Sequence, residues 1–249
     1  MTPMIDLNAD LGEGAGTDDA LFPLISSASV ACGGHAGDSE SMKRALAGCA
    51  EHGVVAGAHP SFVDRENFGR RRMVQPHART ADEVVAQIGT LAEIAAGQGV
   101  ALAYVKLHGA LANMAAEDDT LALAVFGAVQ RDFPSLAVLA MGATAQERAA
   151  LGLGMRWVSE AYADRAYGSD GLLVARNMPG AMITDPDSVV NQCVRLVRDR
   201  EIVAIDGTVL PTRAQSICLH GDTPDAVALA QKISGALKAF ASIASPLRS

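Results

Sequence analysis

The stretch V-A-C-G-G-H-A-G-D, Val30 to Asp38, runs from an apolar segment directly into two glycines, a histidine and an aspartate. An unbroken apolar run of this kind is typical of a strand that is buried on both faces of a parallel sheet. The polar residues behind it indicate either a tight turn or a site at the strand's end. The rest of the chain decides between these two interpretations.

Short apolar runs of the same kind recur along the chain, and amphipathic helical patterns separate them. Seven strand–helix units in 249 residues predict one α/β domain, residues 1–249, with a barrel or barrel-like closed sheet. An open doubly wound sheet is the alternative, because periodicity alone does not separate the two. The expected strands are Met4–Asn8, Ala28–Cys32, Val54–Ala58, Ala101–Leu107, Leu136–Met141, Arg156–Ala161 and Ser216–Leu219.

Start signals for helices lie between these strands. Thr80–Glu83 and Thr144–Glu147 match the capping-box pattern. Asp185 and Thr223 each precede a proline, which suits the first position of a helix.

Two segments between the helices read differently. Ile202–Leu210 carries an Asp-Gly pair between β-branched residues, which predicts a surface hairpin. Val63–Pro76 is polar and rich in arginine, and we expect a long loop, a kind of segment that is often functional.

Polar side chains follow almost every expected strand, and four of the six histidines are among them. The carboxyl ends of parallel strands face one side of the fold, so these side chains should converge. Histidine supplies acid–base chemistry or metal ligation, and carboxylates orient it or share the metal. The residues in question are Asp6, Asn8, Asp10, Glu13, His35, Asp38, His59, Lys106, His108, Glu160, Asp164, Arg165, His220 and Asp222.

Individual members of this set also have structural interpretations. Lys106 ends an apolar strand, where an unpaired charge would be costly, so it needs a partner carboxylate or an anionic substrate. Cys32 is either a nucleophile or, as we expect, a small buried side chain. Arg70–Arg72 either forms a solvated face or reaches an anion from the loop. His52 and His77 read as surface residues.

Composition excludes several classes of protein. A net charge of −8 and 4% aromatic residues argue against nucleic-acid binding. The sequence contains no membrane-spanning apolar run and no signal-peptide pattern. Four scattered cysteines argue against a disulfide scaffold and for the reducing cytosol. The absence of a G-x-x-x-x-G-K-[ST] motif excludes a P-loop.

An ordered set of motifs covers nearly the whole chain and resembles the LamB/YcsF family, understood as the A component of the prokaryotic 5-oxoprolinase. Leu107, Ala112 and Gly34 depart from the residues common in that family, which bears on the shape of the site near the fourth strand. The motifs are D-L-N-A-D-L-G-E-G (Asp6–Gly14), S-S-A-S-V-A-C-G-G-H-A-G-D (Ser26–Asp38), G-A-H-P-S-F (Gly57–Phe62), F-G-R-R (Phe68–Arg71), K-L-H-G-A-L (Lys106–Leu111), E-A-Y-A-D-R-A-Y (Glu160–Tyr167) and C-L-H-G-D (Cys218–Asp222).

The resemblance implies a distorted seven-stranded TIM-like barrel of the glycoside hydrolase/deacetylase type. It implies ATP-dependent opening of 5-oxo-L-proline to L-glutamate, with Mg²⁺ expected beside ATP. It also implies two partner proteins, the 5-oxoprolinase subunits B and C, and leaves a homo-oligomer open.

The expected site follows from these two lines of reasoning. Replacing His59 or Lys106 with alanine is expected to abolish turnover and leave the fold intact. The candidate catalytic residues are Asp10, Glu13, His35, His59, Lys106, His108 and His220. The candidates for binding substrate or phosphate are Asn8, Asp38, Arg71, Glu160, Arg165 and Asp222. The candidates for holding a divalent metal are Asp6, Asp10, His35 and His59.

Two other functions fit the same residues. One is a metal-dependent hydrolase that acts alone, such as a sugar deacetylase. The other is a non-catalytic subunit that binds a small acid and delivers it to partners.

Overall fold

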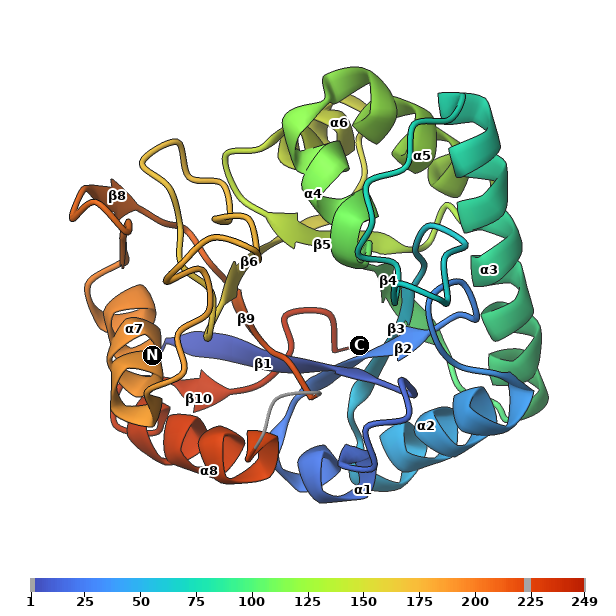
Figure 1. The fold of residues 1–249 in the computed structure, drawn as a ribbon. Coiled ribbons are helices and arrows are strands. Elements are labelled where there is room, and N and C mark those ends of the chain that lie inside the picture. Colours follow the sequence, from blue (N-terminus) through green and yellow to red (C-terminus); the bar gives the residue numbers. More distant parts are fainter. Residues whose placement is uncertain (1–2, 222–224, 249) are drawn as a thin grey trace.

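The computed structural model describes residues 3–221 and 225–248. Among these residues, seven parallel strands close into a barrel surrounded by helices, as Figure 1 shows. The expected barrel is confirmed and the open sheet is wrong, because the last strand of the barrel also pairs with the first. In order around the barrel the strands are β1 (Met4–Leu11), β2 (Ser27–Ala31), β3 (Val55–His59), β4 (Leu102–Val105), β5 (Ala137–Met141), β6 (Trp157–Tyr162) and β9 (Ser216–Leu219).

The helices on the outside of the barrel bury one apolar face each. In α2, for example, Met42, Leu46 and Cys49 lie at helical spacing and are buried. The described helices are α1 (Asp18–Leu21), the 3₁₀ helix η1 (Phe22–Leu24), α2 (Ser39–His52), α3 (His77–Gly97), α4 (Gly109–Glu117), α5 (Asp119–Asp132), α6 (Ala145–Gly152), α7 (Pro186–Arg198) and α8 (Ala226–Leu237).

Three of the expected helix starts can be compared with the structure. Asp185 caps α7 as expected, because its carboxylate accepts a hydrogen bond from the Ser188 amide. The expected start at Thr80 is wrong, since α3 begins at His77 and Thr80 lies inside it. Thr144 precedes α6 as expected, but its side chain makes no capping bond. The start expected at Thr223 lies outside the described residues.

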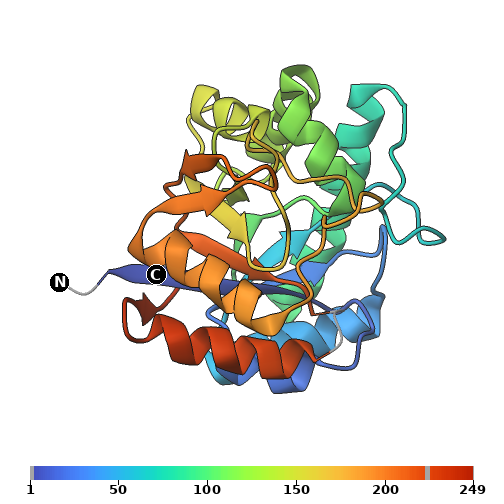
Figure 2. The same cartoon turned by 60° about the vertical axis from the view of Figure 1, so that its left-hand side comes forward.

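Two segments outside the barrel match their predictions. The short strands β7 (Glu201–Val203) and β8 (Val209–Pro211) form the expected antiparallel hairpin. Residues 63–76 form a loop without helix or strand. In Figure 2 this loop projects at the right, on the side toward which β1 points.

The C-terminal segment closes the opposite end of the barrel. A two-residue strand, β10 (Ser242–Ile243), pairs with the beginning of β1. Leu247 then packs with Tyr104, Leu139 and Val158 inside the barrel, near the starts of its strands. Figure 1 accordingly shows the C-terminal end inside the outline of the barrel.

Within the described part of the chain, no helix is both long enough and apolar enough to cross a membrane.

Candidate active site

The carboxyl ends of the barrel strands surround a cleft of about 370 Å³. The strands deliver side chains to it by alternation, because every second residue of a barrel strand points inward. Thus Asn8 and Asp10 of β1 point into the barrel, whereas Leu7, Ala9 and Leu11 join the core under the helices. Residues that line the cleft include Asp10, His59, Arg70, Arg72, Lys106, His108, Tyr162, Arg165, Arg176 and His220.

Lys106 lies at the floor of this cleft and is almost fully buried. Its Nζ atom is 2.8 Å from Asp10 Oδ1 and 3.0 Å from Glu160 Oε1, and it donates to Asn8 Oδ1 at 3.0 Å. Burial alone would lower the pKa of Lys106, but Asp10, the Cys218 thiol and Glu160 hold it well above its usual range. The buried lysine expected to need a carboxylate therefore has two.

The pKa values of the two carboxylates beside Lys106 shift in opposite directions. Burial would raise the pKa of Asp10, but His59 and Lys106 hold it well below its usual value. Burial raises the pKa of Glu160 in spite of the lysine. Asp10 is thus the ionised partner of Lys106, and Glu160 is the group that takes up a proton first.

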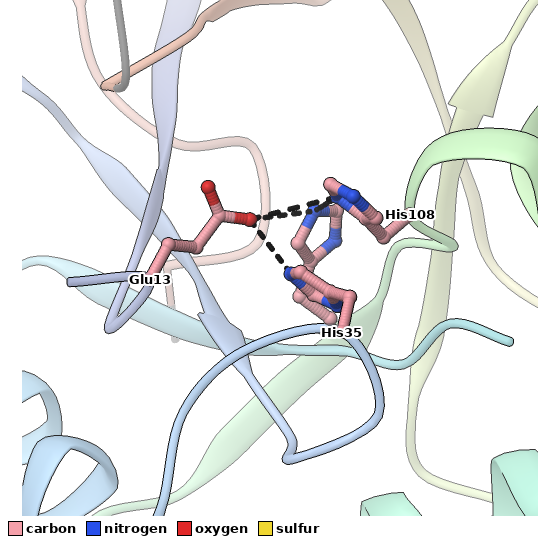
Figure 3. A group of neighbouring side chains, drawn as sticks. Glu13, His35 and His108 are labelled. Carbon is pink, nitrogen blue, oxygen red and sulfur yellow. Dashed lines mark hydrogen bonds and ion pairs between the residues drawn. The ribbon is translucent and has the colours of Figure 1, made fainter. Parts of the chain in front are cut away.

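A cluster of three histidines and one glutamate adjoins this floor (Figure 3). Glu13 Oε1 is 2.8 Å from His35 Nε2, 3.5 Å from His108 Nδ1 and 4.0 Å from His59 Nε2. The rings of His35 and His108 stack with centroids 3.6 Å apart. Burial lowers the pKa of His35 and, together with the other two histidines, holds that of His108 well below its usual range. Both rings are therefore neutral at pH 7.

Glycines in the loops place two members of this cluster. Gly12 and Gly14 adopt left-handed φ angles of +75° and +84°, which turn the chain behind β1 so that Glu13 faces the histidines. Gly33, with φ of +93°, makes the turn that ends β2 before His35. The opening stretch of the sequence is therefore both a tight turn and part of the site.

A fourth histidine, His220, lies on the far side of the cleft. The His220 ring donates through Nδ1 to Asp164 at 2.8 Å, and Arg176 donates to its Nε2 at 3.1 Å. With Nδ1 bound to Asp164, the neutral ring keeps its lone pair on Nε2, and this lone pair accepts from Arg176, which also lines the cleft. Asp10, Cys218 and His220 form a second group that could hold a metal ion, besides Glu13 and the three histidines.

Several expected site residues lie elsewhere. Asp6 lies deeper in the barrel than the histidine cluster, and Ser26, Ser27 and Ser216 donate to its carboxylate. Asp38 is exposed and caps α2 by accepting from the Ser41 amide.

Of the other residues expected to bind an anion, some lie at the cleft and others do not. Arg165 is buried beside the cleft and donates to the Val174 carbonyl. Arg71 is exposed and lies 3.9 Å from Asp64, while its neighbours Arg70 and Arg72 line the cleft. Asp222 lies outside the described residues.

Some residues of the site had no clear signal in the sequence. Tyr162 could have been found by alternation, because it lies two residues beyond Glu160 on β6 and lines the same cleft. Phe68, which packs edge-on against His35 and His108, and Arg176 come from irregular loops that no periodicity describes. Cys32 is buried, and burial raises the pKa of its thiol to about 12, which excludes a thiolate nucleophile at neutral pH.

Three solved structures resemble this chain to different degrees. A crystal structure of a lactam utilization protein from Thermus thermophilus is 38% identical and superposes with a TM-score of 0.89 over 97% of this chain and 99% of that one. A family 4 carbohydrate esterase from Streptomyces lividans is 11% identical, with a TM-score of 0.52 over 98% of this chain and 94% of the esterase. A GH18 chitinase from Pseudoalteromonas aurantia is 10% identical, with a TM-score of 0.50 over 91% of this chain and 99% of the chitinase.

The two more distant likenesses show a barrel of the type found in deacetylases and glycoside hydrolases. The family model for LamB/YcsF matches residues 5–249, almost the whole chain. This chain therefore belongs to the LamB/YcsF family.

Proposed function

We propose that this chain is the A component of a cytosolic 5-oxoprolinase, which couples ATP hydrolysis to the opening of 5-oxo-L-proline together with subunits B and C. Membership of the family and the likeness to a lactam utilization protein support a small cyclic amide as the substrate. The observation that carries the proposal is the cleft itself. Buried groups that can move protons lie at its floor, and arginines line it above them.

The chemistry of the substrate explains why such a cleft is needed. A five-membered lactam is an unactivated amide that also carries a carboxylate. In the proposed reaction, the lactam oxygen attacks the γ-phosphorus of Mg²⁺-bound ATP and displaces ADP. Water then adds to the activated carbon, the C–N bond breaks as the ring nitrogen takes a proton, and a second water releases phosphate from the acyl phosphate to give glutamate.

The residues of the cleft have three roles in this reaction. Arg70, Arg165 and Arg176 provide positive charge for the substrate carboxylate and the transferred phosphoryl group. His220, oriented by Asp164, takes a proton from the attacking water once Arg176 has turned from its Nε2 to the substrate. Lys106 opposes negative charge that develops on the reacting oxygen.

The test measures glutamate formed from 5-oxoproline and ATP by this chain alone and by its mixture with candidate B and C subunits. Activity in the mixture alone supports the proposal. No activity in a mixture of verified assembly contradicts it. Substrate binding with full complex activity in a His220→Gln variant would instead identify a non-catalytic delivery protein.

His220→Gln is expected to lower kcat of the complex by 10²-fold or more, on the order of what a positioned general base contributes. His52→Gln is the matched control, because His52 is exposed at the end of α2 and stacks only on Phe22. Its activity should equal that of the unaltered chain.

The cluster of Glu13 with three histidines favours a second candidate, a metal-dependent hydrolase that acts alone. Lactam or ester hydrolysis by the isolated chain in the absence of ATP, lost on chelation, would support it. Hydrolysis that requires both ATP and the partner subunits would exclude it.

A further inference from the structure

The hydrogen bonds of His59 and His108 fix which nitrogen of each ring carries a proton. His59 Nδ1 is 2.8 Å from the Lys106 carbonyl oxygen, and His108 Nε2 is 3.0 Å from the Phe68 carbonyl oxygen. A carbonyl oxygen only accepts hydrogen bonds, so both of these nitrogens are donors. When both rings are neutral, the other two nitrogens, His59 Nε2 and His108 Nδ1, carry lone pairs.

These two lone pairs face each other at 3.0 Å, inside the protein. Two acceptors at this distance repel unless a cation lies between or beside them. Further negative charge adjoins the pair, because Glu13 Oε1 is 3.5 Å from His108 Nδ1 and Asp10 Oδ2 is 3.3 Å from His59 Nε2.

We propose that Glu13, His59 and His108 bind one divalent transition-metal ion, with Zn²⁺ as the model ion. Two imidazoles and one carboxylate are a ligand set that Zn²⁺ takes in open, three-ligand sites. With metal–ligand bonds of about 2.0–2.1 Å, the atoms of a tetrahedral site lie about 3.3 Å apart. The three ligand atoms here are separated by 3.0, 3.5 and 4.0 Å, close to that value.

The surroundings have the features of a metal site. Each metal-binding histidine usually donates its other ring N–H to a carbonyl or carboxylate, which sets its orientation. His59 and His108 both do so, to backbone carbonyl groups. His35 is a positioning residue, because its Nε2 donates to Glu13 Oε1 at 2.8 Å and thereby aims the carboxylate at the other two rings.

The experiment uses the full chain, stripped with a chelator and titrated with Zn²⁺ by calorimetry, with bound metal counted by elemental analysis. Neither 5-oxoproline nor ATP is present, so this result is independent of the proposed activity. One equivalent per chain is expected, and Co²⁺ in its place should give the visible spectrum of a low-coordinate nitrogen–oxygen site.

Two variants test the ligands and one tests the positioning residue. Glu13→Gln keeps the shape of the side chain, and it and His108→Ala should abolish stoichiometric binding. His35→Ala should weaken it by about 10- to 100-fold, the usual effect of removing a group that orients a ligand. His77→Ala, on the exposed start of α3, is the control and should bind as the unaltered chain does.

His220→Ala separates this site from the second potential group, Asp10, Cys218 and His220. It should leave Zn²⁺ binding unchanged. The proposal is overturned if the stripped chain takes up no stoichiometric metal, if His220→Ala abolishes binding, or if Glu13→Gln, shown to be folded by circular dichroism, binds normally.

Discussion

Lys106 shows how a single buried charge organises the floor of the cleft. Its Nζ atom contacts two carboxylates and an amide, which two strands, β1 and β6, supply. The need for a partner could be predicted from a lysine at the end of an apolar strand. Which carboxylates would serve could not, because contacts between β1, β6 and the end of β4 depend on how the barrel closes.

Removing this charge should affect the fold as well as the reaction. Lys106→Met leaves Asp10 and Glu160 buried without their cation, which typically costs about 3–5 kcal/mol of unfolding free energy. The expectation that Lys106 could be replaced without disturbing the fold is therefore revised. Urea denaturation measures the loss, and Lys232→Met, on the exposed surface of α8, should change stability by less than about 0.5 kcal/mol. Equal stability of the two variants would contradict the buried ion pair.

Cys32, in contrast to Lys106, is expected to be replaceable without loss of activity. Burial raises the pKa of its thiol to about 12, so the thiolate is scarce at neutral pH. The folded chain should resist alkylation by iodoacetamide at pH 8, as measured by intact mass, and Cys32→Ala should retain activity in the assembled complex. Rapid modification of Cys32 in the native state, or an inactive but folded Cys32→Ala variant, would reopen the nucleophile interpretation.

The loop over residues 63–76 packs against the histidine cluster. Gly69 adopts a φ of +62°, and the Ala110 amide at the start of α4 donates to its carbonyl. A Cβ atom at position 69 would lie 2.8 Å from His35 Cβ and 3.1 Å from His108 Cδ2. The loop backbone therefore packs directly against the two stacked rings.

Gly69→Ala should consequently displace the histidine rings, in addition to straining the backbone at position 69. A left-handed non-glycine residue costs about 1–2 kcal/mol by itself. Gly207→Ala, in the β7–β8 hairpin, has the same strain at φ of +88° but no atom within 4 Å of the new Cβ. Thermal unfolding should show the larger loss for Gly69→Ala, which alone should also weaken Zn²⁺ binding. Identical effects of the two substitutions would show that the contact with the rings is unimportant.

Sequence patterns predicted the elements better than their ends. Buried parallel strands have a clear apolar signature, and all seven expected strands are present among the described residues. The start expected for α3 at Thr80 is wrong because the helix follows directly on Pro76, whose φ suits the position before a helix and which lies four residues ahead of Thr80. The arginine loop could be recognised as a loop, but which of its arginines faces the cleft depends on turns at Phe68 and Gly69 that have no periodicity.

At the scale of the molecule, the barrel is closed in two senses. Pairing of β9 with β1 completes the ring of strands, and the C-terminal segment fills one of its ends. The ring could be expected from the number of strand–helix units. The filling of its end by Leu247 could not, because nothing in the sequence near the C-terminus distinguishes a plug from another surface turn.

Leu247→Ala tests how much this plug stabilises the molecule. The side chain is buried against Tyr104, Leu139 and Val158, so a cavity would remain, and the expected loss is about 2–3 kcal/mol of unfolding free energy. Chemical denaturation measures it. Leu123→Ala, on the exposed face of α5, is the control and should cost much less. Since the plug is far from the cleft, the Zn²⁺ affinity of Leu247→Ala should be unchanged.

This plug also bears on the route by which small molecules reach the interior of the barrel. With one end filled by Leu247 and its neighbours, small molecules reach the interior of the barrel from the other end, where arginines line the cleft. In the proposed reaction, glutamate would therefore leave through the same end by which the next lactam enters. A partner protein bound over the arginine-lined opening would control both the entry of substrate and the exit of product.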